Sequence, residues 1–342
     1  MINPAVSFEA PRNVDLKDGE MPRPAPGELL IESSATLIST GTELTALAAE
    51  EPPGTVWASL RRFPGTPGYC NAGRVVDAGS AEDRTWIGTR VASTARHTRY
   101  ACIPTASARP VPHADVSDEE VAFCTLAEIC MNGVRRGGVS WGESAVVFGV
   151  GLLGQLAVRF CRLAGARPVF AVDVAEKRLA LLPEDPGIVP VKADRDYLAA
   201  IVAAHTGSRM ADVAFEVTGN SDLITSEITI LRHQGRFVIL SSPRGKGTLF
   251  NFHDLCNRPS YTIIGAHNLS HPEVATLAQP WTGRRHAELF FDLLADGAID
   301  VGPLISHRYP YREAAQAYSM LLEDRSKAMG VILDWKEDGG DR

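Results

Sequence analysis

Residues 146–155 read VVFGVGLLGQ, an apolar run that ends in three closely spaced glycines, Gly149, Gly151 and Gly154. The run has the length and composition of a strand, and LAVRFCRLAGA, which follows it directly, is expected to form a helix. The three missing side chains therefore lie at the junction between a strand and a helix. At such a junction the absence of a Cβ makes room, either for backbone against backbone or for a ligand.

The context of these glycines predicts a dinucleotide-binding turn. Gly149 would permit a tight turn, Gly151 would let the backbone approach a pyrophosphate, and Gly154 would let the helix pack closely on the strand. With Leu152 and Leu153 they open the helix, whose N-terminus presents free N–H groups and a positive dipole end to phosphates. The alternative is a glycine-rich turn that caps the helix and binds nothing.

The second part of this fingerprint is an acidic residue. The next expected strand, PVFAVD, ends in Asp173, 22 residues after Gly151. An acid about 20 residues further on hydrogen-bonds the adenosine ribose hydroxyls in dinucleotide sites. Asp173 would also repel a 2′-phosphate, so the sequence favours NAD(H) over NADP(H). Lys177 and Arg178 keep NADP(H) open, because either cation could reach a phosphate, and Arg178 is included among the predicted cofactor residues.

The wider pattern indicates two different kinds of domain. From about Val146 to His267, apolar runs of strand length alternate with helical segments, including one expected helix over residues 220–235. This alternation predicts βαβ units and a parallel sheet. The strand runs are apolar throughout, as expected where helices cover both faces of a sheet. The first ~125 residues have short β-like runs between turn signals, which indicates an antiparallel, irregular β-rich domain.

Composition narrows the classes of function. The chain has 342 residues, 45% of them hydrophobic and 22% charged, with a net charge of −7. Because no basic stripe is present, neither nucleic acid nor an anionic membrane is an expected partner. No apolar run approaches the ~20 residues of a membrane span. The N-terminal stretch lacks the basic and apolar regions of a signal peptide, so we expect a cytoplasmic chain with six reduced cysteines.

Taken together, these stretches resemble the medium-chain dehydrogenase/reductase superfamily. The resemblance covers nearly the whole chain and rests on STGTE at 39–43, PGYCNAGRVVDAG at 67–79, GVGLLG at 149–154, FEVTGN at 215–220 and LISHRYPYREAAQAY at 304–318. It implies an α/β fold in which a GroES-like β-rich barrel accompanies a Rossmann domain with a doubly wound parallel sheet. The implied domains are 1–129 with 268–342 for the barrel and 130–267 for the Rossmann domain.

The resemblance also locates the zinc ligands of related enzymes, and most are replaced here. Thr40 stands at the position of a cysteine ligand and Tyr69 at that of a histidine, while Glu128 retains the third position. A catalytic zinc needs about three protein ligands and an open position, and neutral threonine and tyrosine hydroxyls are poor ligands. Segment 93–110, where relatives carry four cysteines for a structural zinc, contains only Cys102. We therefore expect no zinc.

Without a metal, hydroxyl and carboxyl groups must handle the substrate. Thr42 holds the position that starts a proton relay in zinc-dependent relatives, and Tyr69 could donate to a carbonyl oxygen. Glu128 is a candidate general acid or base if burial raises its pKa. Each of the three also has a structural interpretation: a turn hydroxyl, a packed ring and a carboxyl bound to backbone. Glu43 is expected to fix its own loop, and His97 to be a solvated loop residue.

Further residues are candidates for the nicotinamide end of the cofactor. Asn132 follows Glu128 by four residues, on the same face of an expected helix, and in relatives this position lies near the nicotinamide. Thr218 ends the strand ADVAFEV, at the carboxyl edge where open α/β sheets bind ligands. Ser241 and His267 end later strands and are assigned to the same site.

The resemblance implies a zinc-independent, NAD(H)-dependent oxidoreductase. Its reaction would be reversible hydride transfer between a secondary alcohol, similar to a sugar, cyclitol or natural product, and the corresponding ketone. Two alternatives stay open: an NAD(P)H-dependent quinone or enoyl reductase, and a non-catalytic dinucleotide-binding sensor. The expected partners are a small-molecule substrate and a second copy of the chain, paired through SYTIIGAH at 260–267. A tetramer is also compatible with this interpretation.

Overall fold

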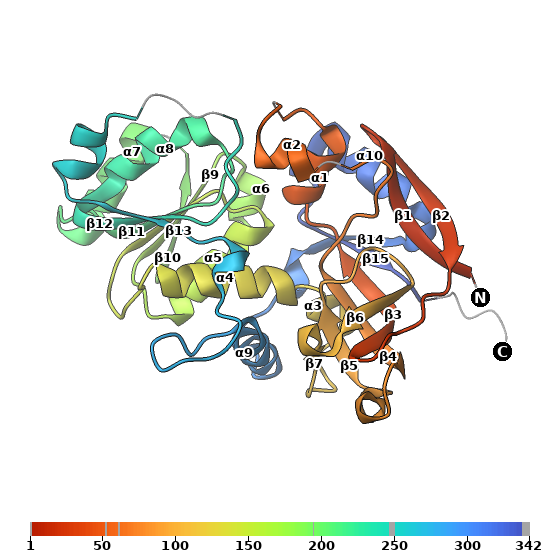
Figure 1. Ribbon diagram of the computed structural model, residues 1–342. Helices are drawn as coiled ribbons and strands as arrows, with labels where there is room; N and C mark the ends of the chain where they lie inside the picture. Colours follow the sequence, from red (N-terminus) through yellow and green to blue (C-terminus); the bar gives the residue numbers. More distant parts are fainter. Residues whose placement is uncertain (1, 52, 61, 194, 246–249, 337–342) are drawn as a thin grey trace. The chain divides into compact units, whose positions relative to one another are not determined.

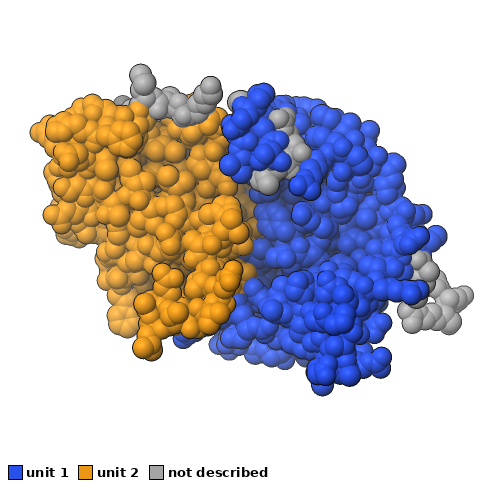
Figure 2. All heavy atoms as spheres, in the orientation of Figure 1, with its two compact units in different colours: residues 1–125, 284–342 blue, residues 126–283 orange. Residues whose placement is uncertain are grey.

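The fold is described from a computed structural model (Figure 1). It describes residues 2–51, 53–60, 62–193, 195–245 and 250–336. The chain divides into two compact units, which Figure 2 shows in different colours. Unit 1 consists of residues 1–125 and 284–342, and unit 2 of residues 126–283.

Unit 2 is built on a six-stranded sheet in which every neighbouring pair is parallel. Its strands are β8 (Ala145–Phe148), β9 (Val169–Asp173), β10 (Ile188–Lys192), β11 (Ala211–Glu216), β12 (Leu231–Ile239) and β13 (Thr262–Gly265). Their spatial order is β10-β9-β8-β11-β12-β13. Counted along the chain from β8 this is 3-2-1-4-5-6, the strand order of a Rossmann domain. The predicted doubly wound parallel sheet is confirmed.

Helices precede and connect these strands along the chain. They are α4 (Cys124–Arg136), which begins at the end of unit 1, α5 (Leu152–Leu163), α6 (Glu176–Leu179), α7 (Arg195–Thr206) and α8 (Ile224–Glu227). Every residue of β8 and β9 is buried, which explains why their sequences are apolar without alternation.

One predicted helix is partly wrong. The helical turns after Asn220 end at Ile230, and residues 231–235, expected to continue the helix, form the first part of β12. Leu231 pairs with Ala211 at the start of β11, so β12 begins earlier in the chain than the local sequence pattern suggests. Pairing with a central strand overrides local preference here.

The contact between α5 and β8 depends on Gly154. A Cβ at this position would lie 1.9 Å from the carbonyl oxygen of Gly149, so helix and turn meet backbone against backbone. Gly149 has φ +85°, a left-handed conformation that residues with a Cβ rarely adopt. A Cβ on Gly151 would meet no atom within 4 Å. Two of the three glycines are thus required by the fold, and the third leaves open space.

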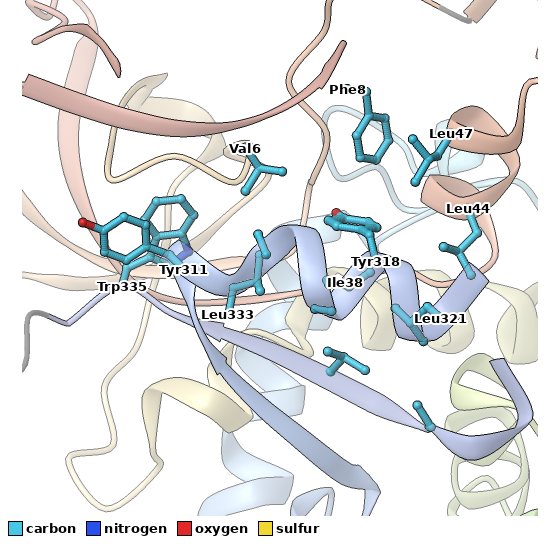
Figure 3. Close-up of a cluster of buried hydrophobic side chains, with 14 residues drawn as sticks. Val6, Phe8, Ile38, Leu44, Leu47, Tyr311, Tyr318, Leu321, Leu333 and Trp335 are labelled. Carbon is cyan, nitrogen blue, oxygen red and sulfur yellow. The ribbon is translucent and has the colours of Figure 1, made fainter. Parts of the chain in front are cut away.

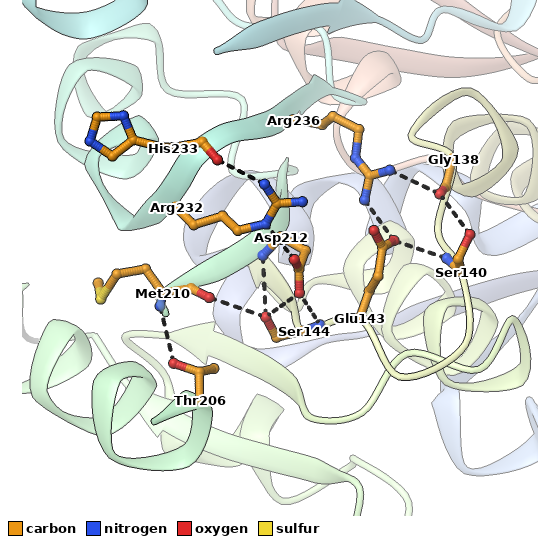
Figure 4. A network of polar contacts seen from close by, with 10 residues as sticks. All are labelled: Gly138, Ser140, Glu143, Ser144, Thr206, Met210, Asp212, Arg232, His233 and Arg236. Carbon is orange, nitrogen blue, oxygen red and sulfur yellow. Dashed lines mark hydrogen bonds and ion pairs between the residues drawn. The ribbon is translucent and has the colours of Figure 1, made fainter. Parts of the chain in front are cut away.

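A polar network closes the amino-terminal edge of the same sheet (Figure 4). Asp212 accepts hydrogen bonds from the Ser144 backbone N–H at 2.8 Å and from Arg232 Nε at 2.5 Å. Glu143 pairs with Arg236 at 2.6 Å. Burial acts to raise the pKa of the Asp212 carboxyl, but the bonds from Arg232 and Ser144 outweigh it and hold this pKa below its ordinary value. The network ties together the starts of β8, β11 and β12.

Residues 268–283 group with unit 2, whereas the predicted domain boundary lies at 267/268. Two side-chain contacts link this segment to α4. The Asn132 amide donates to Ser270 Oγ at 2.8 Å, and the Arg135 guanidinium lies 3.3 Å from the centre of the Trp281 ring. The other predicted boundary, 129/130, falls inside α4. The predicted domain limits stay a prediction.

Unit 1 combines β-structure from both ends of the chain. Its strands are β1 (Ile2–Ala10), β2 (Asn13–Glu20), β3 (Glu28–Leu37), β4 (Asn71–Ala78), β5 (Arg90–Ser93), β6 (Tyr100–Pro104), β7 (Arg109–Pro110), β14 (Ile305–Pro310) and β15 (Gly330–Asp334). A seven-stranded sheet has the order β14-β15-β3-β4-β5-β7, with β6 also on β3, while β1 and β2 form a hairpin. All pairs are antiparallel except β14 with β15.

The helices of unit 1 are α1 (Thr42–Ala48), α2 (Val56–Leu60), α3 (Asp118–Val121), α9 (Gly283–Ala295) and α10 (Ala314–Asp324). Side chains of α1 and α10 join strand residues in a core of aromatic and aliphatic side chains (Figure 3). Tyr318 of α10 packs edge-on against Phe8 of β1, with ring centroids 5.1 Å apart. Trp335 stacks on Tyr311 at 4.8 Å. Within the described residues, no helix is long and apolar enough to cross a membrane.

Replacing Gly154 by alanine should destabilise the protein by about 1–3 kcal/mol, because the new Cβ would overlap the Gly149 carbonyl. Urea unfolding followed by circular dichroism measures the change. Gly151→Ala is the matched control, since its Cβ meets open space and should shift the free energy of unfolding by less than ~0.5 kcal/mol. Equal stability of the two variants would show that α5 is not held by this contact.

Candidate functional site

The carboxyl edge of the unit 2 sheet carries the predicted cofactor turn. Gly151 is the residue that caps the N-terminus of α5, and α5 begins at Leu152. Open space lies where a Cβ on Gly151 would stand, so a ligand can approach the backbone there. The turn lies between β8 and β11, where the strand order reverses. Ligands of open α/β sheets bind at this position, and the first N–H groups of α5 suit a pyrophosphate.

Asp173, at the end of β9, is almost completely buried beside this turn. Its Oδ2 accepts the backbone N–H of Val150 at 2.9 Å, and its Oδ1 accepts that of Ala175 at 2.8 Å. The carboxylate therefore joins the glycine turn to the segment that leads into α6. Arg178 lies 3.6 Å from Asp173 Oδ2, and this cation weakens the expected repulsion of a 2′-phosphate. Contact of Asp173 with a ribose stays a prediction.

Glu216 was missed by sequence reasoning, although it brings two predicted residues together. Its side chain is fully buried at the end of β11. Oε1 accepts hydrogen bonds from Thr218 Oγ1 at 2.6 Å and from the Gly219 N–H at 2.8 Å, and Oε2 accepts from the Ser241 hydroxyl. Thr218 and Ser241, which follow neighbouring strands, are thus held by one carboxylate. An acid at the end of an apolar strand was the available signal.

A second buried carboxyl, that of Glu227 in α8, lies close enough to Glu216 for the Glu216 charge to affect its pKa. Burial, together with the charge of Glu216, raises the pKa of Glu227 to about 8. Its Oε2 is buried and has no hydrogen-bond partner within the described part of the chain. Near pH 7 the Glu227 carboxyl is therefore mostly protonated.

Asn132 of α4 and His267, which follows β13, are linked to each other through Ser270. Asn132 is buried and donates to Ser270 Oγ, whose own proton goes to the His267 carbonyl at 2.7 Å. The exposed His267 ring accepts the N–H of Leu269 through Nδ1 at 3.2 Å. Glu128 is also buried on α4. These contacts give Asn132 and His267 a structural role, and any contact with a nicotinamide stays a prediction.

Unit 1 brings two predicted catalytic residues into direct contact. The Tyr69 hydroxyl donates to Thr42 Oγ1 at 3.2 Å and lies 2.5 Å from the hydroxyl of Ser39, a residue that sequence reasoning did not assign. Thr42 is the first residue of α1. Burial, with smaller effects of Cys70 and Glu43, raises the pKa of the Tyr69 phenol well above its ordinary range. Tyr69 therefore stays protonated and acts as a hydrogen-bond donor.

His97, expected to be solvated, is fully buried, and that expectation is wrong. Its Nε2 lies 3.0 Å from Glu43 Oε2 and its Nδ1 lies 2.8 Å from Thr36 Oγ1. Trp335 Nε1 donates to the same Thr36 oxygen at 2.8 Å. The histidine is held at both ring nitrogens by residues from distant parts of the chain, which no local pattern around His97 indicates.

Glu43 is the centre of this buried network. Its Oε1 accepts the Ser39 N–H at 2.8 Å, so it fixes its own loop as expected. Its Oε2 accepts the Tyr318 hydroxyl in addition to facing His97. Burial, then the charge and hydrogen bond of Glu43, raise the pKa of Tyr318. Glu43 thus connects the loop at Ser39, the His97 side chain and helix α10, which carries Tyr318.

Comparisons with known proteins identify the family. A family model described as "Zinc-binding dehydrogenase" matches residues 153–281. An L-threonine 3-dehydrogenase of Chromobacterium violaceum is 26% identical over 276 residues, covering 79% of this chain and 73% of the relative. The chain belongs to the medium-chain dehydrogenase/reductase superfamily. It is accordingly an oxidoreductase, and its GroES-like and Rossmann folds are those of the superfamily.

Solved structures of this superfamily share the fold over almost the full length. A putative zinc-binding dehydrogenase from Sinorhizobium meliloti, bound to NADP, superposes with a TM-score of 0.76 at 23% identity, covering 98% of this chain and 99% of that one. A protein described as a "short chain alcohol dehydrogenase" from Escherichia coli, complexed with NADH, superposes with a TM-score of 0.78 at 16% identity and the same coverage.

The zinc site of zinc-dependent superfamily members does not fit the residues present here. Tyr69, at a ligand position, keeps a neutral phenol whose oxygen is already engaged by two hydroxyl groups. Thr40 offers a second neutral hydroxyl, and only Glu128 is an ordinary zinc ligand. In the parts of the chain that the structure describes, no group of three or more His, Cys, Asp or Glu could hold a metal ion.

Gly151→Ala should weaken NADH binding roughly tenfold or more, because its methyl group would occupy the space through which a pyrophosphate reaches the turn. Isothermal titration calorimetry measures the affinity. Gly19→Ala, in the hairpin of unit 1, is the control, since its Cβ makes only an ordinary 3.5 Å contact. Unchanged NADH affinity of Gly151→Ala would contradict the proposed position of the pyrophosphate.

The raised pKa of Glu227 predicts a pH-dependent contribution to stability. The folded protein keeps a proton on Glu227 up to about pH 8, whereas the unfolded chain releases it near 4.5. This contribution is complete below the unfolded pKa and is lost as pH rises through 8, with a slope of up to about 1.4 kcal/mol per pH unit. Glu227→Gln should therefore lose less stability than the unsubstituted protein between those pH values.

Urea unfolding at several pH values measures this difference. The exposed Glu184, replaced by Gln, serves as the control and should leave the pH dependence unchanged. Parallel pH profiles for the unsubstituted protein and Glu227→Gln would show that Glu227 does not hold a proton in the folded state.

Proposed function

We propose that this protein is a zinc-independent, NAD(H)-dependent oxidoreductase that transfers hydride reversibly between a secondary alcohol and its ketone. The observation that carries the proposal is the open backbone turn at Gly151, placed at the carboxyl edge of the sheet where the strand order reverses. The substrate class, a sugar-, cyclitol- or natural-product-like alcohol, follows from the sequence resemblance alone. General alcohol and ketone oxidoreduction is supported by the named relatives.

A nicotinamide dinucleotide fits the turn, and bound there it would supply or accept a hydride. The turn from Gly149 to Gly154 would hold its pyrophosphate against the N-terminus of α5. Asp173 is assigned to the adenosine side, where its negative charge would favour NAD(H) over NADP(H). The neighbours bound to NADP and to NADH show that both cofactors occur on this fold, so the preference depends on Asp173 and Arg178.

The chain's own contribution is hydrogen bonding to the reacting oxygen. Tyr69 donates its single proton to Thr42, which leaves the Thr42 hydroxyl as the neutral donor for the reacting oxygen, and a donor aimed at a developing oxyanion stabilises the transition state more than the ground state. The phenol of Tyr69 stays protonated because its pKa is raised. Glu128, buried on α4, is the alternative candidate for the general acid or base beside the Thr42 hydroxyl.

A second function is favoured by one observation. Arg178, 3.6 Å from Asp173, gives the adenosine side a cation that a 2′-phosphate could meet. Use of NADPH would suit an enoyl or quinone reductase, which reduces a C=C bond rather than a carbonyl group.

The test uses protein stripped of metal with a chelator, supplied with NADH or NADPH and a panel of small ketones and enones. We expect ketone reduction, with a kcat/KM for NADH at least tenfold higher than that for NADPH. In Tyr69→Phe, kcat should fall by about a hundredfold. Tyr197→Phe, which removes an exposed phenol, is the control and should keep full activity.

Other outcomes would overturn parts of the proposal. Reduction of enones with NADPH would establish the second function. Tight NADH binding without turnover of any compound would support a dinucleotide sensor. Activity that is lost on chelation and restored by zinc would contradict zinc independence.

A further inference from the structure

Three hydroxyl groups meet at the start of α1, and their hydrogen bonds run in one direction. The Tyr69 hydroxyl donates to Thr42 Oγ1 at 3.2 Å, and Ser39 Oγ lies 2.5 Å from the same Tyr69 oxygen. A hydroxyl group carries a single proton. A phenol that donates to Thr42 must therefore accept from Ser39, which gives the order Ser39 to Tyr69 to Thr42.

This direction decides where the proton of Thr42 points. Its oxygen accepts from Tyr69, so its own proton is free for a group outside the cluster. Among the residues that the structure describes, the Thr42 hydroxyl has no other hydrogen-bond partner. Ser39 is buried and Thr42 is only partly buried, so the accessible end of the cluster is the end that donates. A substrate oxygen at Thr42 would meet an O–H rather than a lone pair.

Ser39 can set this direction because its position is fixed. Its N–H donates to Glu43 Oε1 at 2.8 Å, and its carbonyl accepts the Glu43 N–H at 2.9 Å. The Glu43 carboxylate is in turn held by His97 Nε2 at 3.0 Å and by the Tyr318 hydroxyl. All of these side chains are buried. Buried hydrogen bonds therefore hold the loop that carries Ser39, and the Ser39 hydroxyl faces Tyr69.

We propose that Ser39 is a positioning residue for ketone reduction: by donating to Tyr69 it commits the phenol proton to Thr42, and thereby the Thr42 proton to the substrate carbonyl. The inference rests on the proposed function. As the carbonyl carbon gains a hydride, the electron pair of the C=O π bond moves to oxygen. That oxygen takes the proton of Thr42, Thr42 takes the proton of Tyr69, and the oxygen of the partly exposed Tyr69, still accepting from Ser39, regains the net proton from water.

Loss of the Ser39 hydroxyl allows the opposite direction. The Tyr69 oxygen would then lack a hydrogen-bond donor, and rotation of the Thr42 hydroxyl toward the phenol would replace the lost bond. Thr42 would present a lone pair to the carbonyl oxygen, where negative charge develops during hydride transfer. The cofactor turn lies on unit 2 and should be unaffected.

The experiment compares Ser39→Ala with Ser39→Thr, which keeps a hydroxyl. We expect kcat for ketone reduction to fall at least tenfold in Ser39→Ala, with NADH affinity unchanged, and to recover in Ser39→Thr. Adding Ser39→Ala to Thr42→Val should cause no further loss, because both act through one donor. Ser107→Ala, at a partly exposed serine of unit 1 outside the cluster, is the matched control.

A second measurement does not need turnover. In protein labelled with ¹³C at tyrosine Cζ, the Tyr69 resonance is identified by its loss in Tyr69→Phe. It should shift in Ser39→Ala and return in Ser39→Thr. An unshifted resonance together with unchanged kcat would overturn the inference while ketone turnover still upheld the proposed function. If the unsubstituted protein reduces no ketone, that function fails, and an unshifted resonance would separately show that Ser39 does not donate to Tyr69.

Discussion

The backbone contact between Gly154 and the Gly149 carbonyl is the constraint on which the cofactor half of this protein depends. It brings the first turn of α5 directly onto the end of β8, so that the helix N-terminus lies at the carboxyl edge of the sheet. No side chain can replace this contact, because any Cβ at Gly154 would overlap the carbonyl oxygen. The same geometry leaves the space above Gly151 open, so the structural requirement and the proposed binding function share one short turn.

Buried carboxylates organise what surrounds the two candidate sites. Asp173 joins the glycine turn to α6, Glu216 holds Thr218 and Ser241, and Glu43 holds the turn that carries Ser39 and Thr42. Burying a carboxylate costs free energy unless its oxygens are hydrogen-bonded, and each of these three carboxylates accepts at least two hydrogen bonds. Each therefore fixes loops that would otherwise depend on weak local preferences.

The hydroxyl cluster of unit 1 offers chemistry of a different kind from a metal ion. Zinc polarises a carbonyl by charge, whereas Thr42 and Tyr69 can offer only oriented O–H dipoles. Dipoles are effective only when their direction is settled before the reaction, since a hydroxyl rotor can present either a proton or a lone pair. In the proposed reaction, this requirement would make the surroundings of Ser39 and Glu43 as important as the hydroxyls of Thr42 and Tyr69.

The sequence by itself determined the Rossmann half: glycine spacing, an acid at the end of the next strand and alternating apolar segments are local signals, and the strand order confirms what they predict. Only the tertiary structure decided the rest. Ser39, Tyr69, His97 and Tyr318 meet from segments up to 279 residues apart (318 − 39), and Glu216 gathers residues that follow two different strands. The strand at 231–235 likewise depends on its partner β11 rather than on its own pattern. Local spacing specifies an element, whereas a hydrogen-bonded cluster depends on where the elements pack.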